Sequence, residues 1–184
     1  MPIVRNSFIQ MSKLTNLKGR INYISSHARQ ENLYAVYETT YRKFWTELAK
    51  CNQEEFKRSG TEGKCIEARE LIIALPECFA ALEPKALLQQ FTDYFKNTYD
   101  VECISALHHN KSKTNYHIHL IFSKRKLLSS PVIKLGKNNP LSANIKRNNH
   151  SFTQVTFFHF VADKLKNIFV HNNLHSAAFG WRHK

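Results

Sequence analysis

The chain has 184 residues, of which 42% are hydrophobic, and these figures exclude a wholly disordered chain and allow one domain with a buried core. No apolar run approaches the length of a transmembrane helix, and residues 1–10 lack the charged start and apolar block of a secretory signal, so a cytoplasmic protein without a membrane partner is expected. The formal net charge is +13, and residues 103–184 carry 13 basic side chains against one acidic side chain. This excess of positive charge in the second half of the chain favours a polyanion such as nucleic acid as the partner.

Hydrophobic periodicity divides the first hundred residues into strands and helices. Alternation of apolar and polar residues predicts a first strand over 2–10, and helical spacing predicts helices over 15–30 and 40–57. A short β-branched run predicts a buried strand over 69–75, and a single apolar stripe predicts a third helix over 83–97.

Two strands joined by a polar turn are predicted next, over 101–107 and 115–123, and we expect them to pair as a hairpin. The stretch 129–149 is rich in Ser, Pro, Asn and Lys and indicates a basic linker or loop, which a last helix over 151–173 follows. This order of elements predicts an α+β domain in which a mainly antiparallel sheet packs against helices.

The cysteines exclude two classes of small fold. None of the four belongs to a Cys-x-x-Cys pair, so neither a zinc ribbon nor a dense disulfide scaffold is expected. We therefore expect buried or partly buried thiols in a reducing compartment; they are Cys51, Cys65, Cys78 and Cys103.

Histidines are concentrated in the predicted hairpin, where residues 108–119 hold four of the ten. His117 and His119 lie two residues apart on a strand, so both imidazoles project from one face of the sheet. The partner strand ends in His108 and His109, and only one of these adjacent side chains can project from that same face. Three neutral imidazoles on one face suit Zn, Mn, Fe, Co or Ni, so the pattern predicts a metal site.

The register of the hairpin decides which of the adjacent histidines completes this site. A hairpin centred on Lys113 places His109 opposite His117. A loop of even length places His108 there instead, because a shift of one residue moves every side chain to the other face. The spacing alone leaves both arrangements open.

The hairpin resembles the HUH signature of MobA/MobL-type plasmid mobilisation relaxases, in which a histidine is followed eight positions later by His-x-His and then by Ser/Thr-x-Arg. Here His109 precedes His117-Ile118-His119 by eight positions, and residues 123–125 are Ser-Lys-Arg. The resemblance therefore implies that His109, His117 and His119 are the metal ligands. The chain departs from the family pattern at positions 110 and 116, where Asn and Tyr stand in place of the frequent Asp and the common Pro.

Two earlier segments resemble the same family in the same order. Residues 19–24, Gly-Arg-Ile-Asn-Tyr-Ile, resemble the helix that holds the catalytic tyrosine, which implies that Tyr23 is the nucleophile; spacing alone leaves Tyr34 and Tyr37 as competitors. Residues 70–76, Glu-Leu-Ile-Ile-Ala-Leu-Pro, resemble a strand that ends in Ala-Leu-Pro. This match implies that Glu70 orients a ligand histidine or helps to accept the tyrosine proton.

The resemblance implies a fold and a division of the chain. The HUH relaxase fold has a central antiparallel sheet with the histidine motif on a central strand, flanked by helices. The resemblance assigns residues 1–126 to the catalytic domain and leaves 127–184 as a basic C-terminal segment, a linker followed by one helix.

The activity that the resemblance implies is metal-dependent, site-specific and strand-specific cleavage and transfer of DNA. The tyrosine attacks one DNA strand at the transfer origin of a plasmid or mobile element and forms a 5′-phosphotyrosyl link. Mn²⁺ or Mg²⁺ is the expected ion, with Zn, Ni or Co as alternatives. The implied partners are single-stranded DNA and accessory mobilisation proteins in a bacterial cytoplasm, with no membrane and no small-molecule cofactor.

Four basic residues flank the histidine motif and are candidates for contacts with the DNA backbone. They are Lys111 and Lys113 in the predicted turn, and Lys124 and Arg125 after the second strand. Three other functions remain as alternatives: a DNA-binding remnant that no longer cuts, an HUH replication initiator or transposase, and a metal-dependent hydrolase without a nucleic-acid partner. The initiators and transposases usually carry the tyrosine after the histidine motif, which argues against them here.

Overall fold

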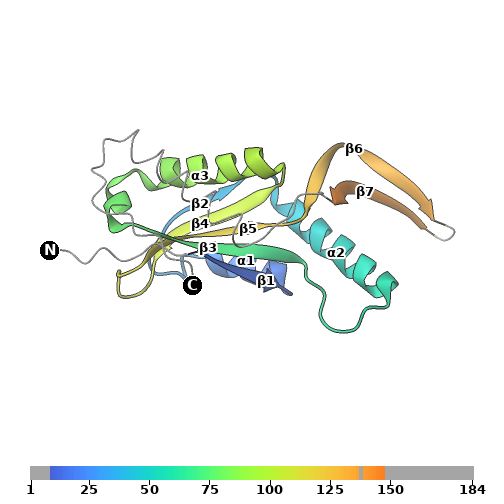
Figure 1. The fold of residues 1–184 in the computed structure, drawn as a ribbon, viewed down its shortest axis with the longest axis horizontal. Helices are drawn as coiled ribbons and strands as arrows, with labels where there is room; N and C mark the ends of the chain where they lie inside the picture. Colours follow the sequence, from blue (N-terminus) through green and yellow to red (C-terminus); the bar gives the residue numbers. More distant parts are fainter. Residues whose placement is uncertain (1–8, 137–138, 148–184) are drawn as a thin grey trace.

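The computed structural model of the chain describes residues 9–136 and 139–147. Five antiparallel strands form one sheet in the order β1-β3-β5-β4-β2. Helix α3 covers one face of this sheet, and α1 and α2 lie on the other (Figure 1). The strands are β1 (Ile9–Leu14), β2 (Leu33–Glu38), β3 (Ala68–Leu75), β4 (Cys103–His109) and β5 (Tyr116–Phe122).

The predicted α+β fold is confirmed, because the His-x-His motif lies on β5, the middle strand of the sheet, and helices flank both faces. The helices are α1 (Leu17–Ile24), α2 (Arg42–Ser59) and α3 (Pro84–Tyr99), and a 3₁₀ turn, η1 (Glu77–Ala81), joins β3 to α3. Among the described helices, none is both long and apolar enough to cross a membrane.

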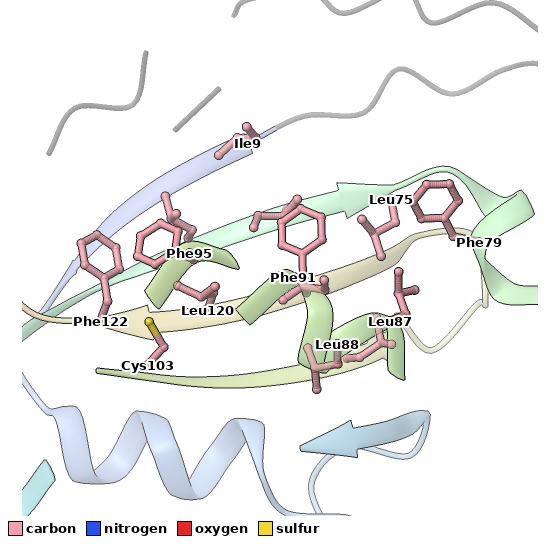
Figure 2. Packing of buried hydrophobic residues seen from close by; sticks show 14 of the residues in the cluster. Ile9, Leu75, Phe79, Leu87, Leu88, Phe91, Phe95, Cys103, Leu120 and Phe122 are labelled. Atoms are coloured by element: carbon pink, nitrogen blue, oxygen red, sulfur yellow. The ribbon is translucent and has the colours of Figure 1, made fainter. Parts of the chain in front are cut away.

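The apolar stripe of α3 packs on the sheet face formed by alternate residues of β3, β4 and β5 (Figure 2). Phe91 and Phe95 are fully buried in this cluster, and Phe95 packs against Phe122 with ring centroids 5.1 Å apart. This core packs against β4 and β5, the two strands that carry the histidine motif.

Replacing Phe91 with alanine should lower the free energy of unfolding by about 3–5 kcal/mol, because it removes a fully buried aromatic side chain and leaves a cavity. Chemical denaturation measures the change. Tyr94→Ala is a matched control on the same helix, since this aromatic side chain is 36% exposed. A loss for Phe91→Ala no larger than the loss for the control would contradict the packing described here.

The opposite face of the sheet is covered by α1 and α2, which pack on Ile104, Ala106 and Ile121. Helix α1 begins where the Asn16 side chain accepts a hydrogen bond of 2.9 Å from the Gly19 amide. A Cβ atom at position 19 would lie 2.6 Å from Asn16 Nδ2, so a larger residue there would displace the Asn16 side chain. The cap fixes the start of the helix that carries Tyr23.

Several predicted boundaries are wrong. The described first strand, Ile9–Leu14, runs past the predicted end at residue 10, and residues 2–8 of that prediction lie outside the described residues. The first helix ends at residue 24 rather than 30, and β2 occupies a stretch for which no strand was predicted. A linker was predicted over 129–149, but the described part of this stretch lies in two paired strands, β6 (Arg125–Gly136) and β7 (Asn139–Arg147). This pair extends beyond the main sheet (Figure 1). The helix predicted over 151–173 lies outside the described residues.

The cysteines are all free thiols, and their burial differs from the prediction at one position. Cys65 and Cys103 are buried and Cys51 is half-buried, as expected, whereas Cys78 is exposed. Cys78 lies in the η1 turn, in which the neighbouring Phe79 is the buried side chain.

Candidate metal and nucleophile site

Three histidines meet on the face of the sheet that α1 covers. His108 on β4 lies directly opposite His117 on β5, and His119 lies two residues further along β5. One ring nitrogen from each of the three lies within 4.8 Å of those of the other two. This group can hold a metal ion, because imidazole nitrogen is a common ligand of divalent transition metals.

Hydrogen bonds orient two of these rings. The Nδ1–H of His117 donates to the Asn115 carbonyl at 3.0 Å, and the Nδ1–H of His119 donates to Glu70 Oε1 at 2.7 Å. Such bonds fix the tautomer in which Nε2 is the free ligand atom. The Nε2 atom of His108 is buried and has no hydrogen-bond partner among the described residues. A buried nitrogen without a partner is costly, and a metal ion would satisfy it.

The environment keeps the two rings of the facing pair neutral. Burial, together with the proximity of His119 and His117, lowers the pKa of His108 from 6.5 to about 3. Burial also lowers the pKa of His117. Metal ligation requires neutral imidazole, so these side chains are in the ligand form at neutral pH before any ion binds.

The structure corrects the choice of His109 as the third histidine. The hairpin loop comprises residues 110–115, an even number, and this register turns His109 to the α3 face, beside Tyr116 with ring centroids 4.6 Å apart. There its Nδ1 lies 2.9 Å from the Tyr34 hydroxyl and its Nε2 lies 3.2 Å from Glu77 Oε2. Both ring nitrogens of His109 therefore have partners outside the histidine cluster.

Glu70 lies on β3 beside the cluster and is 2% exposed. Its carboxylate accepts hydrogen bonds from His119 and from Arg20 Nε, the latter at 2.9 and 3.0 Å to its two oxygens. Burial opposes ionisation of Glu70, but the bonds from His119 and Arg20 outweigh it and lower its pKa. Glu70 is thus an ionised carboxylate that fixes the orientation of His119.

Replacing Glu70 with glutamine should weaken metal binding by about 10- to 100-fold, because the carboxylate that orients and polarises His119 becomes a neutral amide. Calorimetric titration of the protein with Mn²⁺ or Co²⁺ measures this change. Glu77→Gln is the matched control, since it alters the carboxylate beside His109 on the opposite face. Equal affinities in the two variants would show that Glu70 does not support the cluster.

The three tyrosines considered from the sequence lie in different surroundings. Tyr23 on α1 is 41% exposed, and the Arg20 guanidinium carbon lies 5.1 Å from its ring centroid. Among the described residues, the Tyr23 hydroxyl has no hydrogen-bond partner. Tyr34 bonds to His109, and the Tyr37 hydroxyl donates to Asp93 at 2.9 Å, so both hydroxyl groups are engaged on the α3 face.

The four basic residues predicted to contact DNA differ in their exposure to solvent. Lys111 and Lys113 are exposed in the loop that follows His109, the last residue of β4, and Lys124 is half-buried. Arg125 is 6% exposed and is held by Asn52 and by an ion pair with Glu55. The prediction for Arg125 is therefore wrong: this side chain ties the start of β6 to α2.

Sequence reasoning missed one residue at this site. Arg20 contacts Glu70 and Tyr23 and approaches His119, and its spacing of three residues from Tyr23 on a helix was a signal for it. Residues three apart on a helix share a face, so a basic residue beside the expected nucleophile was visible in the sequence.

No protein-family model and no curated protein matches the sequence. A solved structure from work on the molecular basis of vancomycin resistance transfer in Staphylococcus aureus is similar, with a TM-score of 0.62 and 15% identity over 98% of this chain and 100% of that chain. At this identity the likeness shows the fold alone. It agrees with the fold predicted from the relaxase-like motifs, an antiparallel sheet with the histidine motif on its central strand.

Proposed function

We propose that this protein is a relaxase, an enzyme that nicks one DNA strand at a plasmid or mobile-element transfer origin and stays covalently attached to it. The observation that carries the proposal is the position of Tyr23, which is linked through Arg20 and Glu70 to the buried histidine cluster on the same face of the sheet. The fold neighbour from a study of resistance transfer and the basic second half of the chain agree with a DNA partner.

In the proposed reaction the Tyr23 oxygen attacks the phosphorus of the scissile phosphodiester in line with the 3′ oxygen. The bond from phosphorus to the 3′ oxygen breaks, the tyrosine proton passes to solvent or to a nearby base, and the 3′ oxygen takes up a proton. The products are a 5′-phosphotyrosyl link and a free 3′-OH. The number of phosphodiester bonds is unchanged, so the strand can be rejoined by the reverse reaction.

His108, His117 and His119 would hold the divalent ion in this proposal. Such an ion would supply Lewis acidity, offsetting the negative charge that develops on the phosphate in the transition state. Tyrosine is a weak nucleophile at neutral pH, since its ordinary pKa is about 10, so an activated phosphate is needed. Glu70 keeps His119 oriented and is not placed to meet the substrate directly, because it is 2% exposed.

Lys111 and Lys113 are proposed to contact the phosphate backbone beside the scissile bond. Both are exposed, and their loop begins directly after the β4 strand end that carries His108. Contacts of this kind position DNA without reading its sequence. Lys124 remains a proposed contact on the same grounds of charge, at the other end of β5.

Covalent capture of DNA tests the proposed function. Single-stranded oligonucleotides tiled across the DNA next to the gene are incubated with the full chain and Mn²⁺, and the products are run on a denaturing gel. We expect a shifted protein band with one tile, lost with EDTA and lost in His117→Ala.

Two other outcomes would contradict cleavage. Tight binding that falls steeply with salt, without a shifted band from any tile, would identify a DNA-binding module that does not cut. If the protein neither binds DNA nor gives a shifted band, it has a metal site without a nucleic-acid partner, as in the hydrolase alternative.

A further inference from the structure

Arg20 occupies the space between the proposed nucleophile and the histidine cluster. It lies on α1 three residues before Tyr23, so the two side chains share one face of the helix. Its side chain is 27% exposed, although an arginine on a surface helix normally extends into solvent. The fold therefore holds this guanidinium against the site rather than leaving it solvated.

Two contacts account for this position. The Nε–H of Arg20 donates to both oxygens of Glu70, and the guanidinium carbon Cζ lies over the Tyr23 ring, 5.1 Å from its centroid. The second distance is within the range of a cation–π interaction. Arg20 Nη2 also lies 3.3 Å from His119 Nδ1, but that nitrogen already donates its hydrogen to Glu70.

We propose that Arg20 is a positioning residue that couples Tyr23 on α1 to the Glu70–His119 pair on the sheet. The inference rests on the proposed function, since Tyr23 is the nucleophile only in that function. Only arginine offers both an Nε–H that meets a carboxylate and a flat cation that lies against a ring. Arg20 fixes where the Tyr23 oxygen stands relative to the phosphate, and it does not contact the reacting atoms.

The first test measures the coupling itself, without metal or DNA. Double-mutant cycles combine Arg20→Gln with Tyr23→Leu and with Glu70→Gln, and chemical denaturation gives the unfolding equilibrium constants. We expect a coupling of about two- to fivefold in the equilibrium constant for the pair with Tyr23, and at least as much for the pair with Glu70. Arg29→Gln is the matched control, because Arg29 is exposed and its replacement removes the same charge. This variant should show no coupling to Tyr23.

The second test separates positioning from DNA binding. At saturating oligonucleotide and Mn²⁺, Arg20→Gln should slow single-turnover capture by about 100-fold, the scale of a misplaced reacting group, with an unchanged Kd for DNA. Arg20→Lys should recover only part of the rate, because an ammonium group can meet the carboxylate or the ring but not both in this geometry. A purely structural role for Arg20 would change the unfolding free energy without this loss of rate in the folded protein.

The outcomes separate this inference from the proposed function. Three results would overturn the positioning role while cleavage by Tyr23 stands. They are the absence of coupling to both partners, a wild-type capture rate in Arg20→Gln, and an effect of Arg20→Gln on DNA affinity alone. Failure of the wild-type protein to capture any tile would overturn the proposed function and, with it, the role of Arg20 toward a nucleophile, even where coupling is measured.

Discussion

Replacing Tyr23 with phenylalanine is expected to abolish covalent capture of DNA, with a loss on the order of 10⁴-fold or more, the scale seen when a covalent nucleophile is removed. The substitution deletes one oxygen from a side chain that is 41% exposed, so the fold and the DNA affinity should be unchanged. A denaturing gel measures the covalent product, and fluorescence anisotropy measures binding of the same oligonucleotide in parallel.

Other tyrosines provide the controls for this result. Tyr41→Phe removes a hydroxyl from a side chain of similar exposure, 48%, at the start of α2, and should leave capture intact. Tyr34→Phe breaks the bond to His109 on the opposite face and should also leave it intact. Burial raises the pKa of Tyr116 to about 12, which makes it a poor nucleophile. Capture that survives Tyr23→Phe and disappears in Tyr34→Phe would identify Tyr34, on the α3 face, as the nucleophile.

The strands of the site were predictable because their signal is local. Alternation over 115–123 gives the face of His117 and His119 directly, and the structure has β5 over 116–122. The stripe of α3 was equally clear, since its buried residues lie at helical spacing. Both elements are long enough for the repeat of apolar residues to be recognised even where single positions depart from it.

The register of the histidine hairpin was not predictable from the same pattern. Whether His108 or His109 faces α1 depends on whether the loop has an even or odd number of residues, and its polar residues do not specify this. In the structure Asn110 Oδ1 accepts hydrogen bonds from the amides of Thr114 and Asn115, which closes a six-residue loop. The family pattern pointed to His109 because it counts sequence positions and not sheet faces.

Strand β2 and the role of Arg125 were missed for a different reason. Each depends on a partner distant in sequence: β2 pairs with β4, and Arg125 meets Glu55 on α2. Helical spacing persists only to Ile24, and the sequence of β2, Leu-Tyr-Ala-Val-Tyr-Glu, has no alternation of apolar and polar residues that would have marked a strand. A basic residue beside the histidine motif looks exposed in the sequence until the acidic side chain that pairs with it is known.

Replacing His108 with alanine is expected to cost more in metal affinity than the roughly 10- to 100-fold of an outer-sphere change, because it removes one of three proposed ligands. The same substitution at His109 should leave the affinity close to that of the wild type, since this ring lies on the other face of the sheet. Titration with Mn²⁺ or Co²⁺ measures both affinities, and covalent capture should follow the same order.

These adjacent histidines make the comparison sharp, because the chemical change and the strand are the same and only the face differs. Both side chains are less than 10% exposed, so thermal unfolding of both variants shows that each is folded at the temperature of the titration. A loss of metal in His109→Ala, with His108→Ala unaffected, would mean that the hairpin in solution has an odd-length loop and that the family pattern was right. The reverse result would establish that sheet geometry, and not position in the motif, selects the third histidine in this protein.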